Sequence, residues 1–232
     1  MDVEEIDDAL FNLIDDRLMP SSKVRIINLK YFAQYSPDAG FRVSIDGLHN
    51  MLDKGPFIVL YNINHPNQNL DQVLQDPLQL QLNSSLDWGS PINSPAFIEG
   101  YMHYKKIKPH KAAHLIIDIR RIKYVKKKGV EYPVEEPYAW TILPLFTYDE
   151  YINSGIYQLS LFKGASSLSI LKLIRASTEP WQKMMECMRE IDFETKKPLL
   201  EYLYPASVVV RLIDGQREVR YILSIGSLSN SV

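Results

Sequence analysis

The chain has very little cysteine, since Cys187 is the only one in 232 residues. One thiol cannot form an internal disulfide and cannot by itself build a zinc site, and such usage is typical of a reducing compartment. Long apolar runs are also absent, because no window approaches the roughly 18 consecutive apolar residues of a membrane span. The first residues have neither the positive region nor the apolar run of a secretory signal. We therefore expect an intracellular protein of the cytoplasm.

Motifs that carry catalysis or bind cofactors are missing as well. Gly-rich phosphate loops, Gly-x-Ser-x-Gly elbows and kinase signatures do not occur. His110 and His114 are four residues apart, but no Glu separates them as in zincins, and such a pair is more often an exposed turn than a metal site. Cys187 has Lys183 one turn earlier and no nearby histidine, which favours a buried inert thiol. The sequence predicts no enzyme, no cofactor and no metal, although distant side chains could still converge on a site.

Charge is present in both signs but is unevenly distributed. The net charge is only -2, yet residues 1–20 contain seven acidic residues and a single basic one, Arg17. The acidic residues are Asp2, Glu4, Glu5, Asp7, Asp8, Asp15 and Asp16. Residues 103–130 have the opposite balance, with ten lysine and arginine residues and a single acid, Asp118. The basic residues are Lys105, Lys106, Lys108, Lys111, Arg120, Arg121, Lys123, Lys126, Lys127 and Lys128. Clustered like charges attract polyions of the opposite sign over about 8 Å at physiological salt. This asymmetry predicts association rather than fold.

Apolar side chains make up 46% of the chain, enough to bury a large core. Short runs rich in β-branched and aromatic residues predict strands at residues 24–31, 41–45, 57–62, 78–82, 97–104, 115–122, 139–146 and 156–162. So many short strands at this spacing are typical of an antiparallel sandwich rather than of alternating β and α units. We therefore predict a mainly β protein.

Two regions outside these runs have helical periodicity. Ile6, Leu10 and Leu13 fall on one face of an acidic amphipathic helix predicted over residues 1–20, and this apolar face could pack on its own domain or dock onto a neighbouring subunit. Apolar residues three or four apart between residues 168 and 188 predict one or two more helices. Asp214-Gly215 then predicts a hairpin between residues 208–213 and 217–222, which could extend the sandwich or pack on the helices. The predicted parts are a helix at 1–20, a sandwich at 23–164 and an extension at 165–232.

Two aromatic-rich runs are the most specific part of the sequence. Residues 138–146 read Tyr-Ala-Trp-Thr-Ile-Leu-Pro-Leu-Phe, residues 156–164 read Ile-Tyr-Gln-Leu-Ser-Leu-Phe-Lys-Gly, and a polar loop with Asn153-Ser154-Gly155 is predicted between them. This pattern resembles the C2-like domains of ciliary coiled-coil domain-containing proteins, although Ser160 replaces a usual proline. The resemblance implies a C2-like β-sandwich that acts as a scaffold, without known chemistry, in an axonemal or other ciliary complex.

A C2-like fold raises the question of calcium. Calcium sites in such domains gather about five carboxylates from two loops. Here Asp38 is the only acid of the first loop, Asp46 follows on a strand, and Asp149 with Glu150 is the only acidic pair in the loop between the two aromatic-rich runs. We therefore expect solvated loop acids and no calcium-dependent membrane docking.

The basic segment and the N-terminal stripe are the predicted partner-binding residues. The lysines of residues 105–111 and 126–128 flank the predicted strand 115–122, so they could gather at its two ends or lie along one sheet face. Lysines that only solubilise edges are the plain alternative. Acidic tubulin tails would suit a ciliary protein and anionic lipids a calcium-independent C2-like module, whereas no nucleic-acid-binding motif accompanies the charge. The sequence thus predicts a structural subunit that binds other ciliary proteins.

Overall fold

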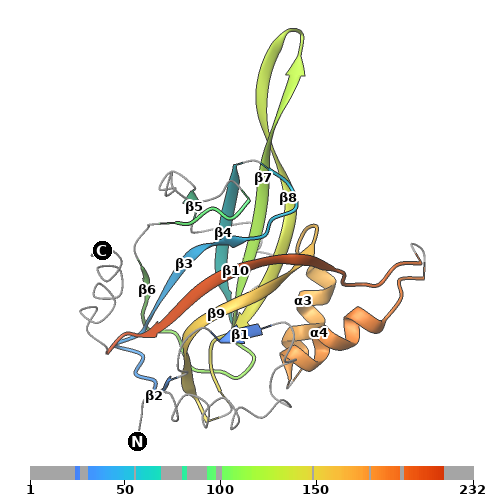
Figure 1. Ribbon diagram of the computed structural model, residues 1–232. Helices are drawn as coiled ribbons and strands as arrows, with labels where there is room; N and C mark the ends of the chain where they lie inside the picture. The colour runs from blue at the N-terminus through green and yellow to red at the C-terminus, as the bar shows by residue number, and fades with distance from the viewer. Residues whose placement is uncertain are drawn as a thin grey trace, which may run out of the picture.

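The computed structural model describes residues 24–26, 31–54, 56–68, 80–82, 93–97, 101–147, 149–177, 179–193 and 196–216. Within these ranges the protein is mainly β, as predicted, with ten strands and two helices (Figure 1). The strands are β1 (Val24–Ile26), β2 (Tyr31–Gln34), β3 (Phe41–His49), β4 (Phe57–Asn64), β5 (Leu80–Leu82), β6 (Met102–Tyr104), β7 (His114–Lys127), β8 (Val130–Pro144), β9 (Tyr151–Lys163) and β10 (Tyr202–Asp214); the helices are α3 (Leu168–Ala176) and α4 (Pro180–Arg189). The helix predicted at 1–20 and the strand predicted at 217–222 lie outside the described residues.

The described strands all belong to one curled antiparallel sheet, which forms a half-barrel. The strand order is β5-β4-β7-β8-β9-β10-β3-β6, and β1 and β2 both pair with β9 outside this order. β10 was predicted as part of an extension but lies between β9 and β3, so the sheet is not completed within residues 23–164. Val208, Val209 and Val210 are all buried, as expected for a strand with neighbours on both edges and covered faces.

The concave face of the sheet holds the main hydrophobic core. Strand side chains alternate between two faces, so Phe57, Val59, Tyr61 and Ile63 of β4 point inward together. They meet inward residues of the other wing of the sheet, including Phe41 of β3. Because the sheet curls, strands far apart in its order contribute to one interior.

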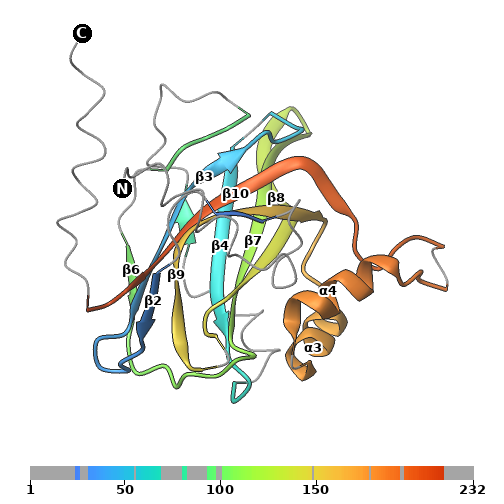
Figure 2. The same cartoon turned by 60° about the horizontal axis from the view of Figure 1, so that its bottom comes forward.

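The two helices cover the opposite face of β7, β8 and β9. Trp140 and Phe162, whose ring centroids lie 5.6 Å apart, pack with Ile174 and Met184 in a second hydrophobic cluster. Figure 2 shows α3 and α4 together at one side of the sheet. The two aromatic-rich runs therefore divide their side chains between two cores instead of filling one interior. Cys187 is buried in the second cluster, as predicted, and burial raises the pKa of its thiol.

The loop predicted around Asn153-Ser154-Gly155 is wrong, because these residues belong to β9. Asn153 and Ser154 are buried, and the Asn153 side chain donates a hydrogen bond to the Pro144 carbonyl at 3.1 Å. The Tyr157 hydroxyl donates to the Asn153 carbonyl at 2.7 Å. The hydrogen bond of the Asn153 side chain stabilises a polar residue inside the strand, which the apolar runs of the sequence do not predict. β8 and β9 are nevertheless neighbours, as predicted, through Trp140 and Phe162.

Neither described helix is long and apolar enough to cross a membrane.

Candidate functional site

β7 and β8 continue well beyond the rest of the sheet as a two-stranded ribbon (Figure 1). β4 pairs with β7 only as far as Arg121, and β9 meets β8 only from Ala139 onward. We call residues 122–136 the arm. From Arg121 to Lys127 the strand advances by six residues, which is about 20 Å at the usual rise per residue. The strand predicted at 115–122 is thus the buried half of a longer element.

A tight turn at Lys128 and Gly129 closes the arm. Both residues have positive φ angles, 52° and 83°, and Lys127 pairs with Val130 across the turn. Two successive positive φ angles match the twist of a two-residue hairpin, and glycine adopts them without steric cost. This turn was not predicted from the sequence, although Lys128-Gly129 between two β-rich runs is a recognisable signal for one.

The strand register gives the arm two distinct faces. Side chains directly opposite each other share a face, so Lys123, Val125 and Lys127 of β7 lie with Val134, Tyr132 and Val130 of β8. We call these six residues the valine face. The other side, the proline face, contains Ile122, Tyr124, Lys126, Glu131, Pro133 and Glu135.

The arm exposes more apolar surface than a solvated hairpin requires. Val125, Val130, Tyr132 and Val134 are 46–52% exposed on the valine face, and Tyr124 is 65% exposed on the other. Contiguous apolar side chains at the surface are typical of interaction sites, whereas single ones need no explanation. The valine face therefore has the chemistry of a contact surface.

The outer edge of β8, in the arm and at its base, is protected against strand addition. Pro133 and Pro137 lie opposite Tyr124 and Arg120. Proline has no backbone N–H, so it is tolerated in a sheet where its nitrogen faces away from the ladder. An incoming strand would find two missing donors along this edge. Strand addition along β8 is therefore disfavoured.

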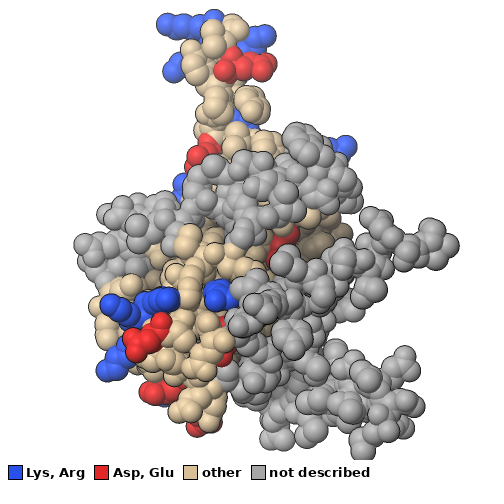
Figure 3. Space-filling model, turned by 90° about the vertical axis from the view of Figure 1, so that its left-hand side faces the viewer, with Lys and Arg blue, Asp and Glu red and all other residues tan. Residues whose placement is uncertain are grey.

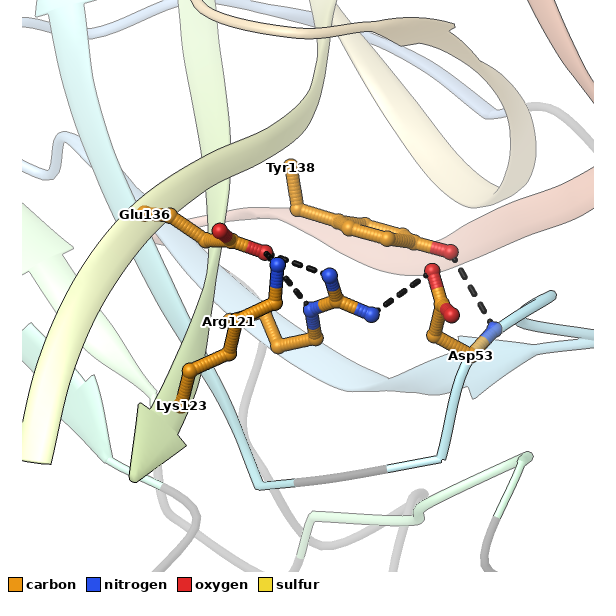
Figure 4. Close-up of polar contacts among 5 residues, drawn as sticks. All are labelled: Asp53, Arg121, Lys123, Glu136 and Tyr138. Atoms are coloured by element: carbon orange, nitrogen blue, oxygen red, sulfur yellow. Dashed lines mark hydrogen bonds and ion pairs between the residues drawn. The ribbon is translucent and has the colours of Figure 1, made fainter. Parts of the chain in front are cut away.

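A polar network fixes the base of the arm to the body of the protein (Figure 4). The Arg121 guanidinium reaches Asp53 at 2.8 Å and also donates to Glu136, which Lys123 contacts at 2.7 Å. The Arg121 guanidinium lies over the Tyr138 ring at 5.3 Å, and that ring packs against Phe57. Hydrogen bonds from Lys123 and then Arg121 lower the pKa of Glu136. The arm thus has an anchored base and an exposed end.

The predicted cationic residues separate into three groups. Arg120, Arg121 and Lys123 are paired with acids, Arg120 through Asp118 at 3.3 Å and Glu135 at 3.5 Å. Lys126, Lys127 and Lys128 lie at the apex of the arm, where they make no ion pair with another described residue. Figure 3 shows blue side chains at the top of this projection, with red ones just beneath.

The remaining lysines lie near the other end of β7. Lys105, Lys106, Lys108 and Lys111 occupy the connection between β6 and β7, and β7 itself spans about 43 Å from His114 to Lys127. Of the two predicted arrangements, the structure has the lysines at the two ends of the strand. The apex and this connection are therefore separate basic sites. Ile6, Leu10 and Leu13 lie outside the described residues.

The histidine pair differs from its prediction, because His114 is fully buried at the start of β7 while His110 is exposed. The Nδ1–H of His114 donates to the Ala112 carbonyl at 3.0 Å, which leaves Nε2 to accept from the Asn64 amide at 3.0 Å. Burial lowers the pKa of His114 to about 4. The ring is a neutral structural group, and the expectation of an exposed turn fails for this residue.

The acids considered for calcium do not gather. Asp46 pairs with Arg211 at 2.7 Å, and burial, partly offset by Arg211, raises the pKa of Asp46. In the part of the chain that the structure describes, no group of three or more histidine, cysteine or acidic side chains could hold a metal ion.

No protein-family model matches this chain, and no curated protein matches it. A function for the protein therefore has to be inferred from the arm and from the resemblance of residues 138–164 to C2-like domains.

Proposed function

We propose that the protein is a non-enzymatic structural subunit of an axonemal or other ciliary complex and acts by binding neighbouring proteins. The arm carries this proposal, because it is anchored at its base and displays apolar and cationic side chains on a narrow projection. The C2-like identity of the curled sheet, and a location in the cytoplasm and the cilium, rest on the pattern of residues 138–164.

The chemistry of the arm favours an acidic protein surface as partner. Lys127 and Lys123 flank Val125 on one row of the valine face, and Val130, Tyr132 and Val134 form the other row. A partner with carboxylates beside apolar side chains would satisfy both rows. Tyrosine supplies a large contact area at low entropic cost, which makes Tyr132 the expected centre of the interface. Acidic tails of tubulin or of other axonemal proteins have the required charge, and nucleic acid is not proposed.

Co-sedimentation with purified axonemes tests this proposal. The variant Lys126→Glu, Lys127→Glu, Lys128→Glu should lose most of its retention, and added salt should release the unmodified protein because exposed charges are screened. The matched control is Lys105→Glu, Lys106→Glu, Lys108→Glu, which makes the same charge change at the other end of β7 and should keep its retention. A protein that does not bind axonemes at all would refute the proposed function.

Calcium-independent binding to anionic membranes is the second candidate, because three lysines at the apex lie next to exposed Tyr124 and Tyr132. Glu131 and Glu135 lie on the arm as well, so an arm lying flat on an anionic bilayer would bring carboxylates to the head groups. We therefore rank this function lower. Retention on phosphatidylserine vesicles without calcium, abolished by the apex variant, would favour it over protein binding.

A further inference from the structure

We propose that the outer edge of β7 in the arm takes up an extended acidic segment as an added strand. That this segment belongs to the partner protein rests on the proposed function, whereas strand addition itself can be tested without axonemes. Among the described strands, β4 pairs with β7 only up to Arg121, and none pairs with this edge from Ile122 to Lys127. We call this stretch the β7 edge. It projects beyond the rest of the sheet in Figure 1.

The backbone of the β7 edge has hydrogen-bonding groups that face away from β8. The Ile122 N–H donates to the Pro56 carbonyl at 3.0 Å, on the side of β4. Backbone groups alternate in direction along a strand, so the N–H and C=O groups of Tyr124 and Lys126 face the same way. Pro133 lies opposite Tyr124, which agrees with this direction, because a proline fits where the pair makes no hydrogen bond. In the described part of the chain, these four groups have no hydrogen-bond partner.

The two edges of the arm differ in their side chains as well. Prolines lie along the β8 edge, whereas residues 122–127 contain none. Lysines on an edge can discourage aggregation without any partner. The β7 edge, however, also exposes Tyr124 by 65% and Val125 by 48%, and both residue types favour pairing in a sheet. Open backbone groups beside such side chains are the features of an edge that accepts a strand.

Charge disfavours a second copy of the chain as the added strand. Two β7 edges related by a two-fold axis would run antiparallel, and each would bring Lys123, Lys126 and Lys127 to the other. Like charges on neighbouring strands are destabilising, and opposite charges are stabilising. Lys126 and Lys127 make no ion pair with another described residue, so both are available to carboxylates. The lysines therefore favour an acidic strand over a second β7 edge.

The alternation of β7 predicts the side chains of this strand. Positions opposite Lys123 and Lys127 lie on the valine face and favour acids, and the position between them, opposite Val125, favours an apolar residue. On the proline face, an acid suits the position opposite Lys126 and an aromatic residue the one opposite Tyr124. A segment antiparallel to β7, in line with β4, would thus read acid, acid, apolar, aromatic, acid. The β8 row of the valine face stays open to the rest of the partner.

A synthetic peptide tests strand addition. Acetyl-Glu-Glu-Val-Tyr-Glu-Val-amide follows the pattern from the position opposite Lys127 to the one opposite Ile122, and its binding to the isotope-labelled full chain is measured by NMR. N-methylation of its second Glu and its Tyr removes the two N–H groups that would face β7. This change should weaken binding by roughly tenfold or more, because two main-chain hydrogen bonds are lost. N-methylation of the first Val and the third Glu, whose N–H groups would face away, is the matched control and should leave binding nearly unchanged.

The protein side of the contact has its own readout. The bound peptide should slow amide exchange of Tyr124 and Lys126, while the Val125 amide, which faces β8, changes little. Equal weakening by both methylated peptides, or binding without slower exchange of these two amides, would overturn strand addition. A peptide that does not bind would overturn it as well.

Two variants at one position connect the β7 edge to axoneme binding. Tyr124→Pro removes an outward N–H without removing a bond to β8, whereas Tyr124→Ala removes the side chain and keeps the N–H. Tyr124→Pro should lose peptide binding and axoneme retention by roughly tenfold or more, and Tyr124→Ala should keep most of both. Undiminished axoneme retention of Tyr124→Pro would refute an added strand from the axonemal partner and leave the proposed function standing. Peptide binding by a protein that axonemes do not retain would refute the proposed function and leave strand addition intact.

Discussion

His114 shows how a single buried ring can make stability depend on pH. Its Nε2 accepts a hydrogen bond from Asn64, and protonation would place two donors face to face in a site without solvent, close to the charge of Arg175. An unfolded histidine has a pKa near 6.5, whereas burial lowers the pKa of His114 to about 4. Between these values the unfolded chain binds the proton and the folded protein does not. Stability from this residue is therefore complete above pH 6.5 and falls as the pH decreases toward 4.

We expect about 3 kcal/mol of unfolding free energy to be lost across this interval through His114. Urea unfolding at a series of pH values measures it. His114→Gln should flatten the pH dependence while lowering stability at pH 7. His110→Gln, at the exposed position four residues earlier, should leave the slope unchanged. An unchanged slope in His114→Gln would show that another group titrates.

At the scale of elements, runs rich in β-branched and aromatic residues predicted the strands wherever a strand borders a core. β3, β4 and the inner half of β7 were found this way, because their inward residues fill the interior. The outer half of β7 was missed, since a ribbon exposed on both faces needs no apolar run and residues 123–127 are rich in lysine. Pro133 and Pro137 are also unusual residues for a strand, although both are tolerated on the free edge of β8.

The candidate site was predicted only in part for a related reason. The lysines at residues 126–128 were identified, but nothing in the sequence set Arg121 opposite Glu136, fifteen residues later. Such pairs depend on the register, which the missed turn at Lys128 and Gly129 determines. The same turn links Val125 to Tyr132 and so creates the valine face.

The turn offers a direct test at this scale. Gly129 has a φ angle of 83°, a region that costs a residue with a Cβ about 1 kcal/mol or more. Gly129→Val should therefore raise amide exchange in the arm, measured by hydrogen exchange with mass spectrometry, while the exchange of β9 and β10 stays the same. Lys128→Gly should slow exchange in the arm, since Lys128 also has a positive φ angle. Exchange that changes equally in arm and body would contradict an independent arm.

At the scale of the whole molecule, one aromatic residue stabilises the fold and a different one is expected to bind the partner. Trp140 is 1% exposed and packs between the sheet and the helices, so Trp140→Ala should cost about 3–5 kcal/mol in urea unfolding. Tyr132 is half-exposed on the arm and contributes no buried surface to either core. Tyr132→Ser should change stability by less than about 0.5 kcal/mol.

Axoneme retention of Tyr132→Ser, measured beside its unfolding free energy, tests most directly whether the protein works through the arm. We predict that retention falls at least tenfold while stability stays unchanged, and that Tyr204→Ser, at an exposed tyrosine of β10, retains normal binding. Undiminished retention of Tyr132→Ser, or an equal loss in both variants, would contradict the arm as the contact site.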